Sequence, residues 1–261
     1  MKKIIYFFII FPFLCFSQFS DDFSDGNFTI NPTWIGDVNL FEVDTNNRLH
    51  LNDSLSGVAS LVTQSQAIHN TTWEFNVRLD FSPSTNNYAK VYLSSDQVDL
   101  SSPLNGIYVR IGGQAGSIDD VSLYLQQGTQ TIEIIDGEDS LVTNNPDVRV
   151  RVTRDDIGNW ELFLDTNGVF FTQGTGIDSS ITSSSFFGVY CKYTITRSDK
   201  FWFDDFIVTQ QSTNLVQEQI NDKAIMKIFN ISGQEVSHNT NNNILFYLYE
   251  DGSVTKRVIL D

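Results

Sequence analysis

Residues that form disulfides or bend the chain are scarce in this sequence. Only two of the 261 residues are Cys, and Cys15 lies in an apolar N-terminal stretch that we expect to be removed, so no disulfide is predicted within the mature chain. Cys191 falls in an apolar segment, where a buried thiol is the usual outcome. With 5 Pro and 16 Gly, turns are left largely to Asn, Asp and Ser. Stability must come from packing, for which 41 % hydrophobic residues, with 21 Phe, are sufficient.

Positive charge is also scarce. The 16 Lys and Arg face 32 Asp and Glu, which gives a formal net charge of −16. Nucleic acid is an improbable partner for such a chain, because binding it depends on basic patches that displace counterions. An excess of carboxylates favours solubility and the binding of metal cations instead.

No hydrophobic run is long enough to cross a membrane as a helix. The longest, residues 4–16, is shorter than the ~18 residues that a span requires. It follows Lys2 and Lys3 and is succeeded by the small residue Ser17, which is the pattern of a cleavable signal peptide over residues 1–17. A lipid anchor on Cys15 is the alternative, although Leu14 is a poor residue to precede a lipidated cysteine. We therefore expect no transmembrane anchor after signal removal.

What the sequence does contain is alternation of apolar and polar residues with a period of two. In residues 73–81, Trp73, Phe75 and Val77 alternate with polar side chains, which is typical of a strand with one buried face. Turn signals such as Asn105-Gly106 and Asn167-Gly168 separate the segments that show this pattern. Further strands are expected near residues 38–43, 48–51, 58–62, 89–93, 106–111, 121–126, 129–135, 148–154, 160–165, 186–194 and 201–208.

About a dozen strands are too many for one open sheet and favour a sandwich of two sheets. We therefore predict an all-β fold, with a two-sheet antiparallel sandwich over residues 18–208. Residues 209–222 are polar and rich in Gln and Asn, as in a linker. Residues 223–261 then form a small C-terminal β unit.

The two ends of the large domain resemble concanavalin A-like lectin and glucanase sandwiches. The resemblance lies in Asp21-Asp22-Phe23-Ser24-Asp25-Gly26 followed by Trp34, and in Phe201-Trp202-Phe203-Asp204-Asp205-Phe206-Ile207-Val208. It implies a jelly-roll sandwich in which the first and last strands lie side by side. Residues 19–208 also resemble an uncharacterised sandwich domain of exported Bacteroidetes proteins, notably at residues 79–84 and 187–193. Lectins, hydrolases and structural modules all use this fold, so it does not decide the function.

The last 40 or so residues resemble the C-terminal sorting domain of proteins exported by the type IX system of Bacteroidetes. The resemblance rests on residues 230–236, Asn-Ile-Ser-Gly-Gln-Glu-Val, and on residues 246–257, which include Tyr247, Tyr249, Asp251 and Gly252. A Pro-Asn-Pro entry, common in that family, is missing. The resemblance implies that the tail engages the type IX export machinery, and that the protein is secreted or displayed on the cell surface after passing through the periplasm.

Acidic residues at both ends of the large domain form the candidate metal site. If the first and last strands are adjacent, as the resemblance implies, five carboxylates converge, and Ca²⁺ takes six to eight such oxygen ligands. A structural calcium ion is one interpretation of this group, and solvated turns at strand ends are the other. The five residues are Asp21, Asp22, Asp25, Asp204 and Asp205.

Aromatic and basic residues in the polar phase of the central strands form the candidate ligand-binding site. Tyr92, Tyr108 and Tyr124 alternate with the core-facing residues of their strands, so we expect them on one face of a sheet. Tyr rings stack on sugars and Arg forks bind hydroxyl or acidic groups, so a polysaccharide or glycoconjugate is the predicted partner. Such residues are also ordinary occupants of a solvated sheet face. The other members of this predicted set are Arg78, Arg110, Arg151 and Tyr190.

No pattern of catalytic residues is evident. Sandwich glucanases carry their carboxylates on one face of a strand, but a period of two places Glu133 opposite Asp136 and Glu138. The three His residues lie near no nucleophile motif, so no catalytic residue is predicted. We expect an exported module that binds carbohydrate. A glycan-active hydrolase or lyase with a non-standard site and a structural adhesion module without a small ligand remain as alternatives.

Overall fold

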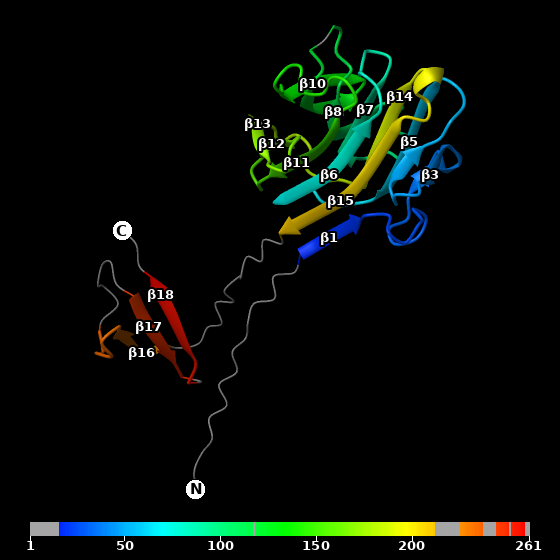
Figure 1. Cartoon of the computed structure of the whole chain (residues 1–261). Coiled ribbons are helices and arrows are strands. Elements are labelled where there is room, and N and C mark those ends of the chain that lie inside the picture. Colours follow the sequence, from blue (N-terminus) through cyan, green and yellow to red (C-terminus); the bar gives the residue numbers. More distant parts are fainter. Residues whose placement is uncertain (1–15, 117, 212–224, 237–243, 251, 259–261) are drawn as a thin grey trace. The chain divides into compact units, whose positions relative to one another are not determined.

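The computed structural model of the protein describes residues 16–116, 118–211, 225–236, 244–250 and 252–258 (Figure 1). The chain divides into two compact units between Thr213 and Asn214, inside the expected linker. Within the described ranges the regular structure consists of β-strands and two short 3₁₀ turns, η1 (Val38–Leu40) and η2 (Ile195–Arg197). No helix in those ranges has the length and apolar character of a membrane span.

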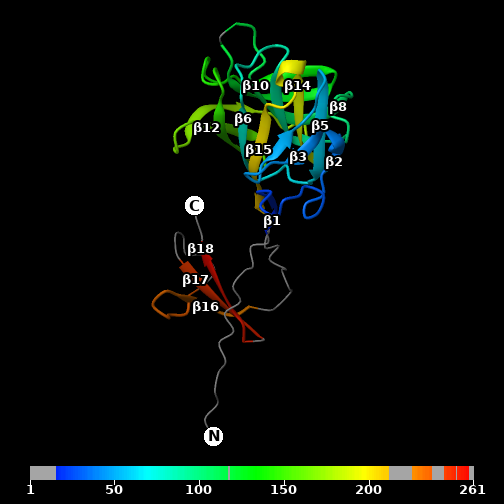
Figure 2. The ribbon, with the colours of Figure 1, turned by 45° about the vertical axis from the view of Figure 1, so that its right-hand side comes forward.

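Two antiparallel sheets form the larger unit. Sheet A has the order β13-β12-β11-β6-β15-β4-β3, with β1 also paired to β15; its strands are β1 (Phe16–Asp21), β3 (Phe41–Val43), β4 (Leu49–Leu51), β6 (Thr71–Leu79), β11 (Asp147–Arg154), β12 (Asn159–Asp165), β13 (Phe171–Ile177) and β15 (Phe201–Gln211). Sheet B has the order β10-β9-β8-β7-β14-β5-β2; its strands are β2 (Ile35–Gly36), β5 (Gly57–Gln64), β7 (Tyr88–Ser95), β8 (Leu104–Ile111), β9 (Val121–Gly128), β10 (Gln130–Ile135) and β14 (Phe186–Tyr193). The neighbours β6 and β15 lie side by side in both views (Figure 1 and Figure 2). The predicted two-sheet sandwich is confirmed.

One apolar core fills the space between the sheets. It takes every second residue from each central strand, as the period-two pattern predicts. Sheet A contributes Trp73 and Trp160, whose rings stack with centroids 5.7 Å apart, and sheet B contributes residues such as Val91 and Val189. Cys191 lies in this core as a free thiol, and burial raises its pKa well above the ordinary value.

The first and last strands of the large unit are adjacent, as the resemblance implied. β1 pairs with the second half of β15 along its whole length, with Asp21 opposite Phe206. Strict alternation fails in β15, because a bulge at Asp204 and Asp205 shifts the register against β6. Asp205 has a φ of 51°, a conformation that Asp tolerates better than most residues. Phe206 is therefore buried in place of Asp205.

The smaller unit is a three-stranded antiparallel sheet, sheet C. Its order is β16-β17-β18, with bounds β16 (Ile225–Asn230), β17 (Ile244–Tyr249) and β18 (Val254–Val258). Leu245, Tyr247 and Tyr249 on one side of β17 form its core, against which Ile228 and Val236 pack. This unit has a hydrophobic cluster of its own.

The expected boundaries of the segments differ from the observed strands by a few residues. β15 continues to Gln211, so the paired strand enters the segment that was expected to be linker. β1 begins at Phe16, so it includes the last two residues of the expected signal peptide. The rest of that peptide, residues 1–15, lies outside the described residues.

Candidate functional site

The outer face of sheet B carries most of the predicted ligand-binding residues. On this face the side chains alternate with those of the core, so Tyr92 (β7), Tyr108 (β8) and Tyr124 (β9) belong to a separate cluster from Val91, Val109 and Leu123. The three tyrosines are direct cross-strand neighbours. Their ring centroids are 5.0 Å apart for Tyr92 and Tyr108, and 5.3 Å apart for Tyr108 and Tyr124.

These three tyrosines are buried, which the sequence did not indicate. Their relative exposures are 0 %, 3 % and 8 %, because Leu100 from the connection between β7 and β8 and Leu104 at the start of β8 pack in the same cluster. Sheet B is therefore packed on both faces at this point. The tyrosine row is therefore buried and is not an exposed surface on which a ligand could stack.

Hydrogen bonds hold the hydroxyl groups of this row. The Tyr92 hydroxyl donates to Oε1 of Gln126 at 2.8 Å, and the Tyr124 hydroxyl donates to Glu133 on β10. Burial raises the pKa of Tyr92 and Tyr124 far above the ordinary value and that of Tyr108 to about 12. The tyrosines are therefore neutral hydrogen-bond donors at physiological pH.

Lys90 lies in the next row of the same face and was not among the predicted residues. Its ammonium group is 4.2 Å from the ring centroid of Tyr108, 5.1 Å from that of Tyr190 and 5.6 Å from that of Tyr92. Burial, reinforced by the charges of Arg110 and Lys192, lowers the pKa of Lys90 to about 8. The sequence could have predicted the position of Lys90, because it is two residues from Tyr92 and so lies on the same face of β7.

Arg110 and Tyr190 flank Lys90 in its own row. Arg110 on β8 and Tyr190 on β14 are its two cross-strand partners, and the Arg110 guanidinium lies 4.6 Å from the ring centroid of Tyr124. Tyr190 and Tyr88 are partly exposed, with ring centroids 6.4 Å apart. We call Tyr88, Lys90, Arg110 and Tyr190 the Lys90 cluster.

Arg78 and Arg151 lie on sheet A, away from this cluster. Because they belong to β6 and β11, they occupy the outer face of the opposite sheet, and the predicted set of seven ligand-binding residues does not form one site. Arg151 donates through Nε to Glu74 at 2.8 Å, and its guanidinium lies 4.0 Å from the ring centroid of Phe170. The sequence assigned both arginines a polar phase but not a sheet.

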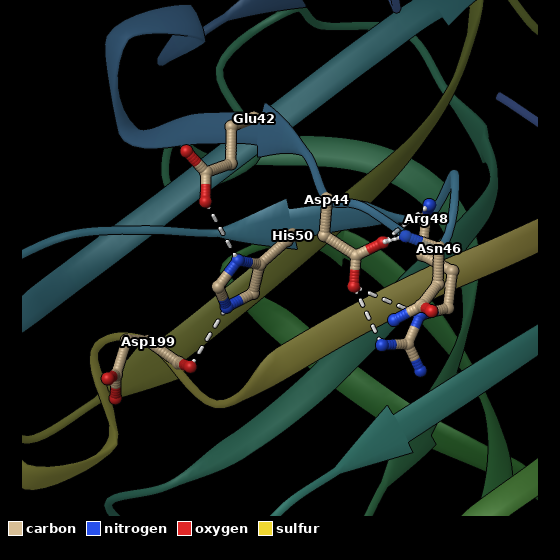
Figure 3. Close-up of polar contacts among 6 residues, drawn as sticks. All are labelled: Glu42, Asp44, Asn46, Arg48, His50 and Asp199. Atoms are coloured by element: carbon tan, nitrogen blue, oxygen red, sulfur yellow. Dashed lines mark hydrogen bonds and ion pairs between the residues drawn. The ribbon is translucent and has the colours of Figure 1, made fainter. Parts of the chain in front are cut away.

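Arg78 packs on an aromatic group of sheet A instead. Trp202 on β15 lies between Arg78 and His50, with the His50 ring stacked on it at a centroid distance of 4.6 Å. The ring nitrogens of His50 contact Glu42 Oε1 at 3.2 Å and the carbonyl oxygen of Asp199 at 2.9 Å (Figure 3). These contacts occupy both ring nitrogens.

An ion pair between Arg48 and Asp44 lies beside Trp202 in the same region. Arg48 donates through Nη2 to Oδ2 of Asp44 at 2.7 Å, and Asn46 donates its backbone N–H to the same carboxylate (Figure 3). The Arg48 guanidinium also lies 5.4 Å from the ring centroid of Trp202. Arg48, Asp44 and His50 are therefore paired within this region, whereas Arg78 contacts the ring of Trp202.

The five predicted metal ligands are divided by the bulge in β15. Asp21, Asp22, Asp25 and Asp205 line one hollow of about 440 Å³ beside β1, but Asp204 does not line it. Burial, with the charges of Asp205 and Asp22, raises the pKa of Asp204 to about 6. The adjacency of the first and last strands thus brings four of the five residues to one place.

The four carboxylates nevertheless do not fit a calcium ion. Asp21 accepts hydrogen bonds from Trp34 Nε1 at 2.8 Å and from the backbone N–H of Phe23. Asp22 accepts from Ser24, and Asp25 from Asn27, as in ordinary turns. In the part of the chain that the structure describes, no three His, Cys, Asp or Glu side chains are arranged to hold a metal ion. The four carboxylates therefore line a common hollow without converging on one point.

Comparison with known proteins identifies the fold. No protein-family model matches this sequence, and no curated protein is detectably similar to it. Among solved structures, the exoplasmic/lumenal domain of VIP36 in its Ca²⁺/Man3GlcNAc-bound form matches with a TM-score of 0.55 at 11 % identity, over 77 % of this chain and 92 % of that chain.

Two other solved structures match in the same way. The carbohydrate recognition domain of Emp47p has a TM-score of 0.53 at 12 % identity, over 75 % of this chain and 95 % of that chain. The legume lectin-like domain from Entamoeba histolytica has a TM-score of 0.52 at 11 % identity, over 75 % of this chain and 97 % of that chain. The larger unit is therefore a legume-lectin-like β-sandwich. Identities this low establish the fold alone.

The burial of the tyrosine row leads to a testable expectation about stability. Replacing Tyr92 with Ala should lower the free energy of unfolding by about 3 kcal/mol, because it leaves a cavity beneath Leu100 and Leu104. Tyr92→Phe should cost about 1 kcal/mol, since it removes the bond to Gln126 and the long contact from Lys90 but leaves the ring in place. Urea unfolding of both variants measures these costs.

Val58→Ala is the matched control, because Val58 lies on β5 of the same sheet and is 38 % exposed. It should change the free energy of unfolding by about 0.5 kcal/mol or less. A Tyr92→Ala variant as stable as this control would show that the tyrosine row is an exposed surface.

Proposed function

We propose that the sandwich is a carbohydrate-binding module and that its ligand contacts the Lys90 cluster on the outer face of sheet B. The observation that supports this most is the fold, which is shared with the carbohydrate recognition domain of Emp47p and with the VIP36 domain in its Ca²⁺/Man3GlcNAc-, Ca²⁺/Man- and Ca²⁺/Man2-bound forms. The proposal concerns the sandwich unit, and it assigns no catalytic step.

The chemistry of the Lys90 cluster supports this choice of surface. Tyr88 and Tyr190 present partly exposed rings, and a sugar buries one apolar face when it stacks on such a ring. Lys90 and Arg110 supply N–H donors, which suit the oxygen atoms of a sugar. The outer face of sheet A is a poorer surface for stacking a sugar. The ring of Trp202 is covered by His50 and Arg78, and Arg48 beside it is paired with Asp44.

A glycan array probed with the full chain tests the proposal. Binding to one or more glycans is expected, and Tyr190→Ala should weaken it at least tenfold, or by about 1.4 kcal/mol, because Ala cannot replace the stacked ring. Arg78→Gln, on the opposite sheet, is the control and should bind as the wild type does. Release of a product from a bound glycan would favour the hydrolase or lyase alternative. Absence of binding to every glycan would favour a structural adhesion module.

Calcium is not part of the proposed mode of binding, because the acidic residues beside β1 do not fit it. The array signal and the melting temperature should therefore be the same in EDTA and in millimolar Ca²⁺. A rise in melting temperature with Ca²⁺ that Asp22→Asn or Asp205→Asn removes would restore the predicted site, since a bound ion stabilises the folded state by RT ln(1 + [L]/Kd).

We also propose that the C-terminal unit directs export, following the type IX resemblance, after removal of a signal peptide over residues 1–17. Its separate hydrophobic cluster supports this role, because a unit with its own core can be recognised by the export machinery independently of the sandwich. Deleting residues 214–261 should leave the sandwich folded but confined to the periplasm of a type IX host. Cell fractionation checks this, and normal secretion of the truncated chain would contradict the export role.

A further inference from the structure

Lys90 is a partly buried cation without a counter-charge. Its one hydrogen bond is a long contact of 3.5 Å to the hydroxyl of Tyr92, and it forms no ion pair within the described part of the chain. A buried charge is costly unless it is paired, so a lysine with only structural duties is expected to have a carboxylate beside it. The chain has 32 acidic residues from which such a partner could have come.

Arg110 is unpaired as well. Its Nε is buried without a hydrogen-bond partner, and it too forms no ion pair with a described residue. Arg110 is the direct cross-strand neighbour of Lys90, and like charges in that position are destabilising. Lys192, from β14, adds a third cation on the same face, with its ammonium 5.6 Å from the ring centroid of Tyr88.

Burial raises the pKa of Asp119 and Asp120, and the charge of Arg110 opposes that rise, but neither carboxylate forms an ion pair with Arg110 and both accept hydrogen bonds from neutral donors, as Glu133 does. Glu133 accepts the hydroxyl proton of Tyr124, and Asp120 accepts hydrogen bonds from Ser122 and Gln114. Asp119 accepts from the backbone N–H of Gln114. The donors of Lys90 and Arg110 are therefore left for a group that comes from outside the chain.

We infer that the ligand is an anionic glycan, whose carboxylate or sulfate group binds Lys90 and Arg110 while a sugar ring packs on Tyr190 and Tyr88. This inference rests on the proposed carbohydrate-binding function and specifies its ligand class. The chain as a whole has a net charge of −16 and repels polyanions, so binding of an acidic glycan requires a local cationic site. An anion over the pair also relieves the repulsion between Lys90 and Arg110.

Two pairs of matched probes separate charge from sugar recognition. The first is a hexamer of galacturonate and the same hexamer with its carboxylates methyl-esterified. The second is a sulfated galactan oligosaccharide and its desulfated form. Calorimetric titration of the full chain with each probe at about 0.15 M salt is expected to show at least tenfold tighter binding of the charged member of one pair, and which pair responds tells a carboxylate ligand from a sulfate ligand.

Variants then locate the effect. Lys90→Gln and Arg110→Gln should each remove the preference for the charged probe, measured as the ratio of the affinities for the charged and neutral members of a pair. Lys200→Gln and Arg149→Gln remove the same charges from positions outside sheet B and should bind as the wild type does. Because Lys90→Gln removes an unpaired buried charge, its melting temperature should not fall below that of the wild type.

The outcomes distinguish this inference from the function on which it rests. Equal affinity for the charged and neutral members, or a preference that survives Lys90→Gln, overturns the anionic ligand but leaves a carbohydrate-binding module. Binding of neutral glycans on the array with no binding of either charged probe has the same meaning. If no glycan of any kind binds, the proposed function fails together with the inference.

Discussion

The packing of two sheets through one alternating set of side chains decides which residues are free for other roles. Except at the bulge in β15, each central strand gives alternate residues to the core between the sheets, so only the other set can face outward. On sheet B part of that outward set is buried a second time, under Leu100 and Leu104. What remains accessible near the centre of the face is the short row around Lys90, and the proposed function depends on that row.

The basic residues on the outer faces of sheets A and B differ in their partners. On sheet A, Arg149 and Arg151 pair with Glu74, and Arg48 beside β4 pairs with Asp44, whereas Arg78 packs on Trp202 and Arg154 donates to backbone carbonyl oxygens. On sheet B, Lys90 and Arg110 have aromatic rings and no described carboxylate within ion-pair distance. Aromatic faces attract cations but compensate for burial only in part. Two directly adjacent cations without an ion-pair partner, in a strongly acidic chain, are the reason for assigning the ligand site to sheet B.

Sequence patterns were sufficient for the fold and insufficient for the site. Period-two alternation predicted most strands of the sandwich, but not β13, whose residues include Gly174 and Gly176 and few apolar side chains. Asn105-Gly106 looked like a turn and lies inside β8, where a side chain at Gly106 would collide with the carbonyl oxygen of Ser94. Alternation gives the face of a residue within its strand but not the sheet to which the strand belongs, so Arg78 was grouped with Tyr92. The bulge that separates Asp204 from Asp205 is likewise a tertiary feature.

The ionisation of Lys90 tests the central claim most directly. In the titration of lysine side-chain Cε and Hε signals by NMR, the signal that is lost in Lys90→Gln should have its midpoint near pH 8, while ordinary lysines titrate near about 10.4. A bound acidic oligosaccharide should move that midpoint upward, because an anion favours the charged form. The opposite result is a Lys90 midpoint that falls among those of the other lysines and does not change with acidic oligosaccharides. It would contradict the claim that Lys90 is an unpaired cation that binds an anionic ligand.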